Sequence, residues 1–307
     1  MSKLITALCV LAGIGAGGTA VAGCGADDAV GLDVAKAAEA TAQKKTARIA
    51  IKVSVEGAGL PLPVMLDAKG VTALDSSRGK LTFDLGPLLG IAGAPQGTPG
   101  DLELRFDGGS LYAKPPKLDA LPIPGGKAWV SLELARLATA LGLPSKGLGK
   151  LFTLEPAAQL RALKAAKGLK EVGKEEIGGT ETTHYRGTFK LTDLVATLPA
   201  GERKEAEDAI AAIDKLGPAS DSSFDDPTPA DLWVDEDGVT RKLLSTAKFP
   251  AQGGQPGGTI EQSYELSDFG VALDAAPPPA EDTYDATGAL TDVLKQSATP
   301  GLGTATP

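Results

Sequence analysis

The chain has 307 residues and is acidic, with 39 Asp and Glu side chains against 30 Lys and Arg. Because it contains no basic block, this balance argues against nucleic acid as a partner. It has one histidine and two cysteines, too few of the usual ligands for a zinc site, and we expect no cofactor. Aromatic residues make up only 4%, so a cavity would be lined mainly by aliphatic side chains.

The first 23 residues have the pattern of a secretory signal peptide. Lys3 is followed by an uncharged, largely apolar run that ends at Val21, and Ala22-Gly23 precede Cys24. This end resembles the lipobox of bacterial lipoproteins, which implies that Cys24 becomes the first mature residue and carries a diacylglyceryl thioether and palmitate. Two acyl chains anchor a protein stably. We therefore expect a lipid-anchored protein on the extracytoplasmic face of the cell membrane, with a flexible tether at 24–31.

One alternative stays open at this end of the chain. Residues 4–22 are just long enough to span a bilayer as a helix. Glycine and threonine in this run, and the single cation before it, favour the lipoprotein. Because Cys9 leaves with the signal peptide and Cys24 is acylated, we expect the domain to fold without a disulfide.

Residues 32–45 are predicted to form a helix, and Asp33 can cap its start. The period changes at 48–56, where β-branched residues alternate with polar ones, as in a strand with one apolar face. The same alternation, or a run bounded by turn residues, predicts further strands. These lie at 65–74, 80–85, 102–107, 110–114, 127–132, 169–177, 182–191, 231–235, 239–249 and 259–267.

Short connections between most of these strands favour antiparallel pairing. The predicted fold class is therefore α+β, a curved sheet of about ten antiparallel strands covered by helices. We place this domain at 32–275 and expect a disordered tail, rich in Pro, Thr and Gly, at 276–307. The covering helices are predicted at 132–141, 156–166, 191–198 and 201–216.

Patterns that elsewhere mark catalysis or metal binding fail in their context. The G-x-G-x-x-G match at 13–18 lies in the signal peptide, and S-x-x-K at 77–80 lies in a turn without its partner motifs. The acidic residues 235–238 lack ligands at both ends of a calcium loop. His184 lies on the polar face of a predicted strand, where a surface histidine is favoured over a catalytic one. We predict no enzyme, no catalytic residue and no metal site.

Three apolar runs are not needed by the predicted strands. They lie at 85–93, 134–143 and 148–154. One interpretation is that they complete the core. The other is that they line or cover an apolar cavity, or touch the membrane surface.

Strand and turn sequences spread over 32–285 carry a family resemblance. Besides the lipobox and the strand Thr46–Glu56, they are Asp107-Gly-Gly-Ser-Leu-Tyr112, Ala128-Trp-Val130, Val172-Gly173, Gly179-Thr-Glu-Thr-Thr-His-Tyr185, Leu232-Trp-Val-Asp-Glu-Asp-Gly238 and Ser267-Asp-Phe-Gly270. With them the chain resembles the LolA-like lipoproteins of actinobacteria, the LppX/LprA/LprF/LprG group and its relatives. The resemblance implies a strongly curved antiparallel half-barrel with helices over its concave side. It also implies an apolar cavity between the two that holds acyl chains.

The leading hypothesis is a monomeric, membrane-tethered, non-enzymatic carrier of lipid or lipoglycan in the cell envelope, with residues 191–216 as a mobile cover. The alternative is a structural or signalling envelope lipoprotein with a closed core, which acts through protein partners. In the carrier, apolar strand residues would form the wall that faces the ligand. These are Ile49, Ile51, Val53, Val55, Leu81, Phe83, Leu102, Leu104 and Phe106.

Overall fold

The computed structural model describes the domain in several ranges. Cys24 with its signal peptide and tether, the predicted helix 156–166 and residues 298–307 lie outside the described residues. In the described part, no helix is long and apolar enough to cross a membrane. The described ranges are 36–57, 63–91, 93–95, 97–116, 123–140, 167–196, 200–215, 227–249 and 256–297.

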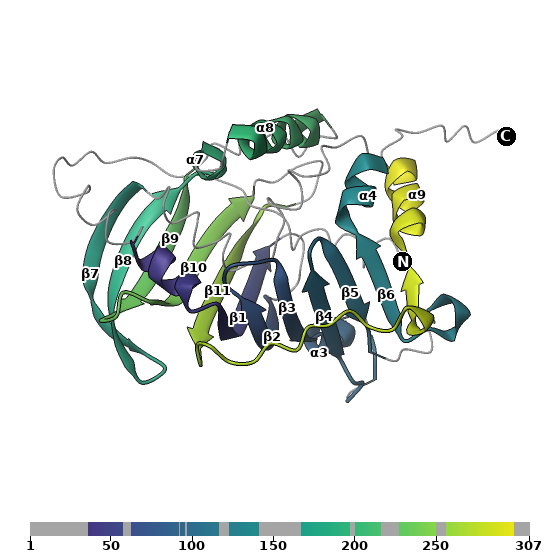
Figure 1. The fold of residues 1–307 in the computed structure, drawn as a ribbon, viewed down its shortest axis with the longest axis horizontal. Coiled ribbons are helices and arrows are strands. Elements are labelled where there is room, and N and C mark those ends of the chain that lie inside the picture. Colours follow the sequence, from purple (N-terminus) through teal and green to yellow (C-terminus); the bar gives the residue numbers. More distant parts are fainter. Residues whose placement is uncertain are drawn as a thin grey trace.

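Twelve strands form one open, curved sheet in the order β12-β6-β5-β4-β3-β2-β1-β11-β10-β9-β8-β7 (Figure 1). Two runs of sequential neighbours, β1 to β6 and β7 to β11, meet where β1 pairs with β11. Every pair is antiparallel except β12 with β6, which is parallel. The strands are β1 (Thr46–Gly57), β2 (Val64–Ala73), β3 (Arg78–Asp84), β4 (Asp101–Asp107), β5 (Ser110–Lys114), β6 (Trp129–Glu133), β7 (Lys167–Ile177), β8 (Thr180–Phe189), β9 (Thr228–Asp235), β10 (Thr240–Phe249), β11 (Gly258–Ser267) and β12 (Thr283–Asp285).

One side of the sheet is apolar from strand to strand because the register aligns the apolar positions. Ile51 of β1 lies opposite Ala68 of β2 and Tyr264 of β11, and Ala68 in turn lies opposite Phe83 of β3. Since residues directly opposite in neighbouring strands point to the same side, these side chains share one face. We call it the apolar face. The opposite side, which carries Lys52 and most other charged strand residues, is the polar face.

The first described residues, 36–43, form a helix as predicted. Its Ala37 and Ala38 are buried in the hydrophobic core together with the apolar face of β1, β2 and β11. Thr41 fixes the helix to the sheet, because its hydroxyl donates to the Ala37 carbonyl (2.6 Å) and accepts from the Thr240 amide (2.8 Å). This helix therefore covers part of the apolar face.

The later helices agree with the predicted segments wherever the structure describes them. The predicted helices 132–141, 191–198 and 201–216 correspond to α4, α7 and α8, whereas α3 lies in a stretch predicted only as an apolar connection. In Figure 1, α7 and α8 lie at the top and α4 and α9 at the right. The helices are α3 (Gly86–Ile91), α4 (Leu134–Ala140), α7 (Leu191–Ala196), α8 (Ala200–Lys215) and α9 (Thr287–Ser297), with 3₁₀ turns η2 (Pro124–Gly126) and η4 (Ala280–Asp282).

The chain continues as ordered structure beyond residue 275, so the boundary predicted there was placed too early. Residues 271–282, which we call the strap, run from β11 to β12 along the lower side of the sheet (Figure 1). Its Ala276 carbonyl accepts from Arg105 Nη1 (2.8 Å), and its Asp282 carbonyl accepts from the Ala128 amide (3.1 Å). The proline run has few N–H donors, which makes it look unstructured in sequence, but its neighbours' carbonyls still bind the sheet.

After the strap, β12 and α9 form a second strand–helix unit, which lies beside the first unit, β6 and α4. β12 pairs with β6, and α9 packs against α4. Asp285 joins the two units, because it accepts from the Thr287 amide at the start of α9 (2.9 Å) and from Arg136 Nη1 on α4 (2.7 Å). Hydrogen bonds from Thr287, together with Arg136, lower the pKa of Asp285 to about 2.

This carboxylate predicts an acid-sensitive junction. An Asp titrates near ~3.9 when unfolded, so its lowered folded pKa stabilises the fold at neutral pH and the stabilisation is lost between about pH 4 and the folded pKa of about 2. We expect Asp285→Asn to flatten the fall in melting temperature over that window. The control is Asp292→Asn, which changes an exposed carboxylate on the adjoining helix α9. Equal acid profiles for wild type and Asp285→Asn would contradict the assignment.

Candidate functional site

The nine predicted wall residues all lie on the apolar face, contributed by β1, β3 and β4. Five of them belong to the buried core cluster, and the other four pack against it while still half-buried. The buried five are Ile49, Ile51, Val53, Leu81 and Phe83, and the half-buried four are Val55, Leu102, Leu104 and Phe106.

One buried polar group on this face, the Tyr264 phenol, is paired, whereas the buried Thr240 hydroxyl has no hydrogen-bond partner among the described residues. The Tyr264 hydroxyl on β11 donates to Gln262 Oε1 (2.9 Å). Burial raises the pKa of Tyr264 to about 12, and the phenol therefore stays neutral. A buried hydroxyl with a partner costs little compared with an unpaired one, so the face remains suited to apolar contacts.

Burial falls from the middle of the sheet toward β6. The apolar-face positions of β1 and β3 are mostly under 7% exposed, while those of β4, β5 and β6 are all half-buried. The register continues the apolar row across these strands: Leu104 lies opposite Ala113, which lies opposite Val130. The sheet therefore keeps an apolar surface at β4–β6 that the protein itself covers less completely. Sequence alternation identified the face but carries no signal for this difference.

Phe106 lies directly against a glycine of the neighbouring strand. A Cβ placed on Gly79 of β3 would fall 2.2 Å from Cζ of the Phe106 ring. The glycine thus makes room for the ring where β3 meets β4, and Gly79 itself is buried. A side chain at position 79 would push Phe106 away from the wall.

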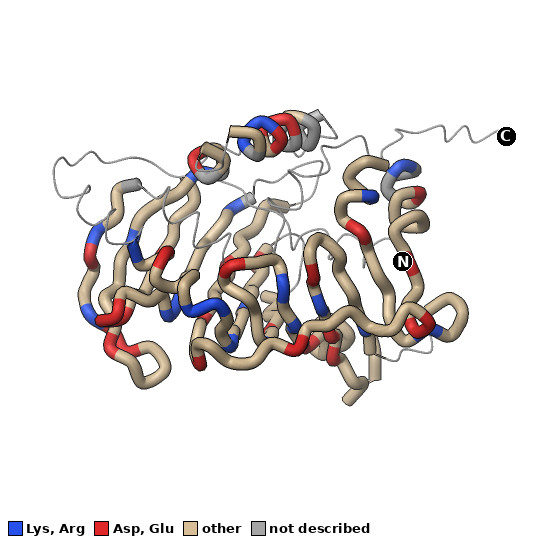
Figure 2. The backbone as a smooth tube through the Cα atoms, in the orientation of Figure 1, with Lys and Arg blue, Asp and Glu red and all other residues tan. Residues whose placement is uncertain are grey.

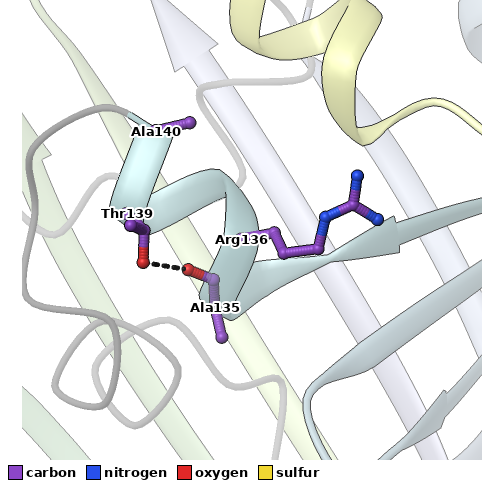
Figure 3. A pocket seen from close by; sticks show the side chains of 4 residues that line it. All are labelled: Ala135, Arg136, Thr139 and Ala140. Atoms are coloured by element: carbon purple, nitrogen blue, oxygen red, sulfur yellow. Dashed lines mark hydrogen bonds between the residues drawn. The ribbon is translucent and has the colours of Figure 1, made fainter.

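A separate open hollow of about 370 Å³ lies on the flank of α4 and is lined by Ala135, Arg136, Thr139 and Ala140 (Figure 3). The Thr139 hydroxyl donates to the Ala135 carbonyl (2.9 Å). Arg136 extends away from Thr139 (Figure 3) and pairs with Asp285 of β12. None of the predicted wall residues lines this hollow, and its polar groups are used within α4 and its junction with β12.

His184 lies on the polar face of β8, as predicted, but it is buried rather than exposed, at 4%. Its Nδ1 lies 2.9 Å from Glu175 Oε1 and its Nε2 lies 2.6 Å from Asp231 Oδ1. Both ring nitrogens are therefore engaged by carboxylates of neighbouring strands. Because the ring is buried and both nitrogens contact these partners, neither one faces a nucleophile, which argues against His184 as a general base.

Trp233 covers this histidine from the adjacent strand. The two rings are stacked, with centroids 4.3 Å apart and planes 13° from parallel, and Trp233 Nε1 donates to Glu175 Oε2 (2.9 Å). That hydrogen bond, with a second from His184, lowers the pKa of Glu175. The cluster joins β7, β8 and β9. Sequence alone could not place His184 beside Trp233, because the pairing depends on strand register.

Within the described ranges, no group of three His, Cys, Asp or Glu side chains is placed to hold a metal ion. Charged residues are distributed along the strands and along α8 (Figure 2). The candidate site is therefore the apolar face, not a polar centre.

The fold defines the class: a curved, antiparallel half-barrel of the α+β type. No family model matches the chain. Among solved structures it is similar to the lipoprotein LppX of Mycobacterium tuberculosis (TM-score 0.45, 14% identity, 82% of this chain and 100% of that chain). It is also similar to LprF of Mycobacterium bovis (TM-score 0.43, 14% identity, 82% and 98%). A LolA superfamily protein of Nitrosomonas europaea matches with TM-score 0.27 and 8% identity, covering 81% and 94% of the two chains.

Two curated relatives come from Streptomyces. An uncharacterized 31.2 kDa protein of Streptomyces griseus is 28% identical over 233 residues, which are 74% of this chain and 70% of that protein. A protein of Streptomyces coelicolor whose name describes it as a candidate lipoprotein is 26% identical over 162 residues, 52% of this chain and 43% of its own length. These similar proteins include lipoproteins of actinobacteria and a LolA superfamily protein, the group that the sequence resemblance named.

Proposed function

We propose that this protein is a monomeric, non-enzymatic lipoprotein of the cell envelope, anchored through Cys24, that binds an acyl chain of a lipid or lipoglycan on the apolar face of its sheet. The observation that carries the proposal is the uneven burial of that face. β1–β3 are covered, whereas the apolar residues of β4–β6 are only half-buried. A hydrocarbon chain laid there would remove further apolar area from water, at about 25 cal/mol per Å².

The half-buried residues define where the ligand would lie. Leu102, Leu104 and Phe106 project from β4, and Val55 from the far end of β1. The fully buried residues of the predicted wall, such as Ile51 and Leu81, would support this surface from within the core rather than touch the ligand. Helices α7 and α8 are proposed as the cover, with Val195 and Ala206 as their buried contacts.

The alternative, an envelope lipoprotein with a closed core that acts through protein partners, is favoured by one observation. The centre of the apolar face is buried as completely as an ordinary core, with Ile49 at 2% and Leu81 at 1% exposed. A core of this kind needs no ligand. The two functions differ in whether lipid accompanies the purified protein.

The test is the lipid content of a variant that fills the half-buried surface. We expect Leu104→Trp to lower the lipid extracted per chain several-fold relative to wild type, measured by mass spectrometry of organic extracts. The larger side chain would occupy the volume of the acyl chain. Val53→Trp is a poorer probe, because Val53 is only 6% exposed and overpacking a core costs about 1–3 kcal/mol.

The matched control is Thr82→Trp, which places the same side chain on the polar face of the adjacent strand. It should carry as much lipid as wild type. Equal loss in both variants would assign the effect to instability. Full lipid content in Leu104→Trp would place the ligand elsewhere.

A further inference from the structure

Residues 85–100 form an uncharged connection between β3 and β4. The stretch contains α3 and is bounded by Asp84 and Asp101, and no Lys, Arg, Asp or Glu lies between them. Helix α3 itself has the sequence Gly-Pro-Leu-Leu-Gly-Ile and contains no charged residue. Exposed connections in proteins are usually polar. An uncharged connection of this length therefore suggests a surface that contacts something apolar as well as water.

Large apolar side chains are exposed in and beside this connection. Ile91 at the end of α3 is 53% exposed, and Met65 on β2 is 56% exposed. The β2–β3 register pairs Asp67 with Asp84, which places Met65 next to the start of α3, and α3 lies against β2. Two of the four most exposed large apolar residues in the described part therefore lie at the same end of strands β2 and β3, beside α3.

The backbone of the connection is hydrogen-bonded internally. The Leu85 amide donates to the Gly100 carbonyl (2.9 Å) and closes its base, and the Ala94 amide donates to the Leu89 carbonyl (2.9 Å). The Gly86 amide donates to Asp84 Oδ1 (2.8 Å). Unpaired backbone groups prevent a segment from entering an apolar medium. These hydrogen bonds satisfy part of the backbone of this connection and so lower the cost of placing it against an apolar medium.

We propose that the α3 edge, defined as residues 85–91 with Met65, is a membrane-contact surface that rests on the apolar boundary of the bilayer. A bilayer is the occupant because the proposed anchor keeps one within reach. Residues 24–35 join Cys24 to the first described helix and can span at most about 40 Å. The inference therefore rests on the proposed anchor, but it does not require lipid on the apolar face.

The charged residues around the α3 edge determine whether its contact with a bilayer is electrostatic or apolar. Asp67, Asp84 and Asp101 flank it, so attraction to anionic lipid cannot drive binding. The contact must be apolar and insensitive to salt. Leu85 and Leu88 pack against the core and join the edge to the β4 part of the wall, which brings the half-buried surface next to the bilayer.

The test uses the mature chain, residues 24–307, with Cys24→Ala, so that only the folded protein can bind. It should bind zwitterionic phosphatidylcholine vesicles weakly in co-sedimentation, equally at low and high salt. Ile91→Asp should weaken binding by about tenfold, since it replaces an apolar side chain that the bilayer would bury with a charged one. Val172→Asp changes an equally exposed residue, 51% exposed on β7, and should have no effect.

Three results would overturn the proposal. The first is no binding to vesicles, and the second is binding that needs anionic lipid and falls with salt. The third is equal binding by the Ile91→Asp protein and by the protein that carries Cys24→Ala alone. The lipid extracted from Ile91→Asp separates this proposal from the proposed function. Normal lipid content with lost vesicle binding supports a membrane surface distinct from the ligand site. Loss of both would show that the substitution acts through the wall, and would count against a separate surface.

Discussion

The Cys24→Ala variant is expected to leave washed membranes almost completely and to be recovered in the soluble fraction. Two buried acyl chains contribute about 0.8 kcal/mol per CH₂, far more than the apolar contact proposed at α3. Removal of the thiol removes both chains, because the diacylglyceryl thioether forms on that sulfur. The measurement is membrane fractionation of the full chain, with the N-terminal peptide analysed by mass spectrometry for the acyl modification in wild type.

A matched control is Cys9→Ala, which changes the cysteine inside the predicted signal peptide and should leave anchoring intact. Retention of Cys24→Ala on washed membranes would favour the alternative, in which residues 4–22 span the bilayer. Combining it with Ile91→Asp excludes residual binding by the α3 edge. An unmodified wild-type N-terminus would contradict the anchor directly.

Gly70→Val is expected to destabilise the fold by at least ~3 kcal/mol, among the larger effects of a single substitution. A Cβ at Gly70 would fall 1.9 Å from the Lys80 carbonyl oxygen and 2.9 Å from Leu81 Cα. Both are backbone atoms of β3, which is held on its other side by β4. The added side chain can be accommodated only if β2 and β3 move apart, which disrupts the apolar face that they share.

Thermal unfolding followed by circular dichroism measures this effect. For a domain of this size we expect a fall in melting temperature of about 10 °C. Gly288→Ala is the control, since nothing lies within 4 Å of a Cβ at that helical position, and it should melt at or slightly above the wild-type temperature. A Gly70→Val protein that melts with wild type would show that the two strands are not in close approach.

Alternation predicted the sheet well because each strand has one apolar face. The pattern at Ile49–Val55 and at Leu81–Phe83 needed no knowledge of partners, and both segments are strands with those residues buried or half-buried. β12 was missed because three residues, Thr283–Asp285, are too short to show a period. Its pairing with β6 depends on the strap, whose prolines indicated disorder.

The sequence predicted which face of the sheet forms the candidate site. It did not predict how deeply each residue of that face is buried. Alternation shows which side of β4 is apolar, but the half-burial of Leu104 against the full burial of Leu81 depends on what packs above each strand. The same holds for His184. Its polar-face position follows from the sequence, whereas its burial follows from a register that stacks it on Trp233.

The central claim, that the apolar face holds lipid, is tested most directly by the lipid content of wild-type protein. Organic extracts of the chain purified under conditions that add no lipid should contain an acyl lipid at close to one molecule per chain, beyond the covalent anchor. The Cys24→Ala protein, which lacks that anchor, should contain the same amount. A clean extract from both would contradict the carrier and leave the closed-core lipoprotein as the function.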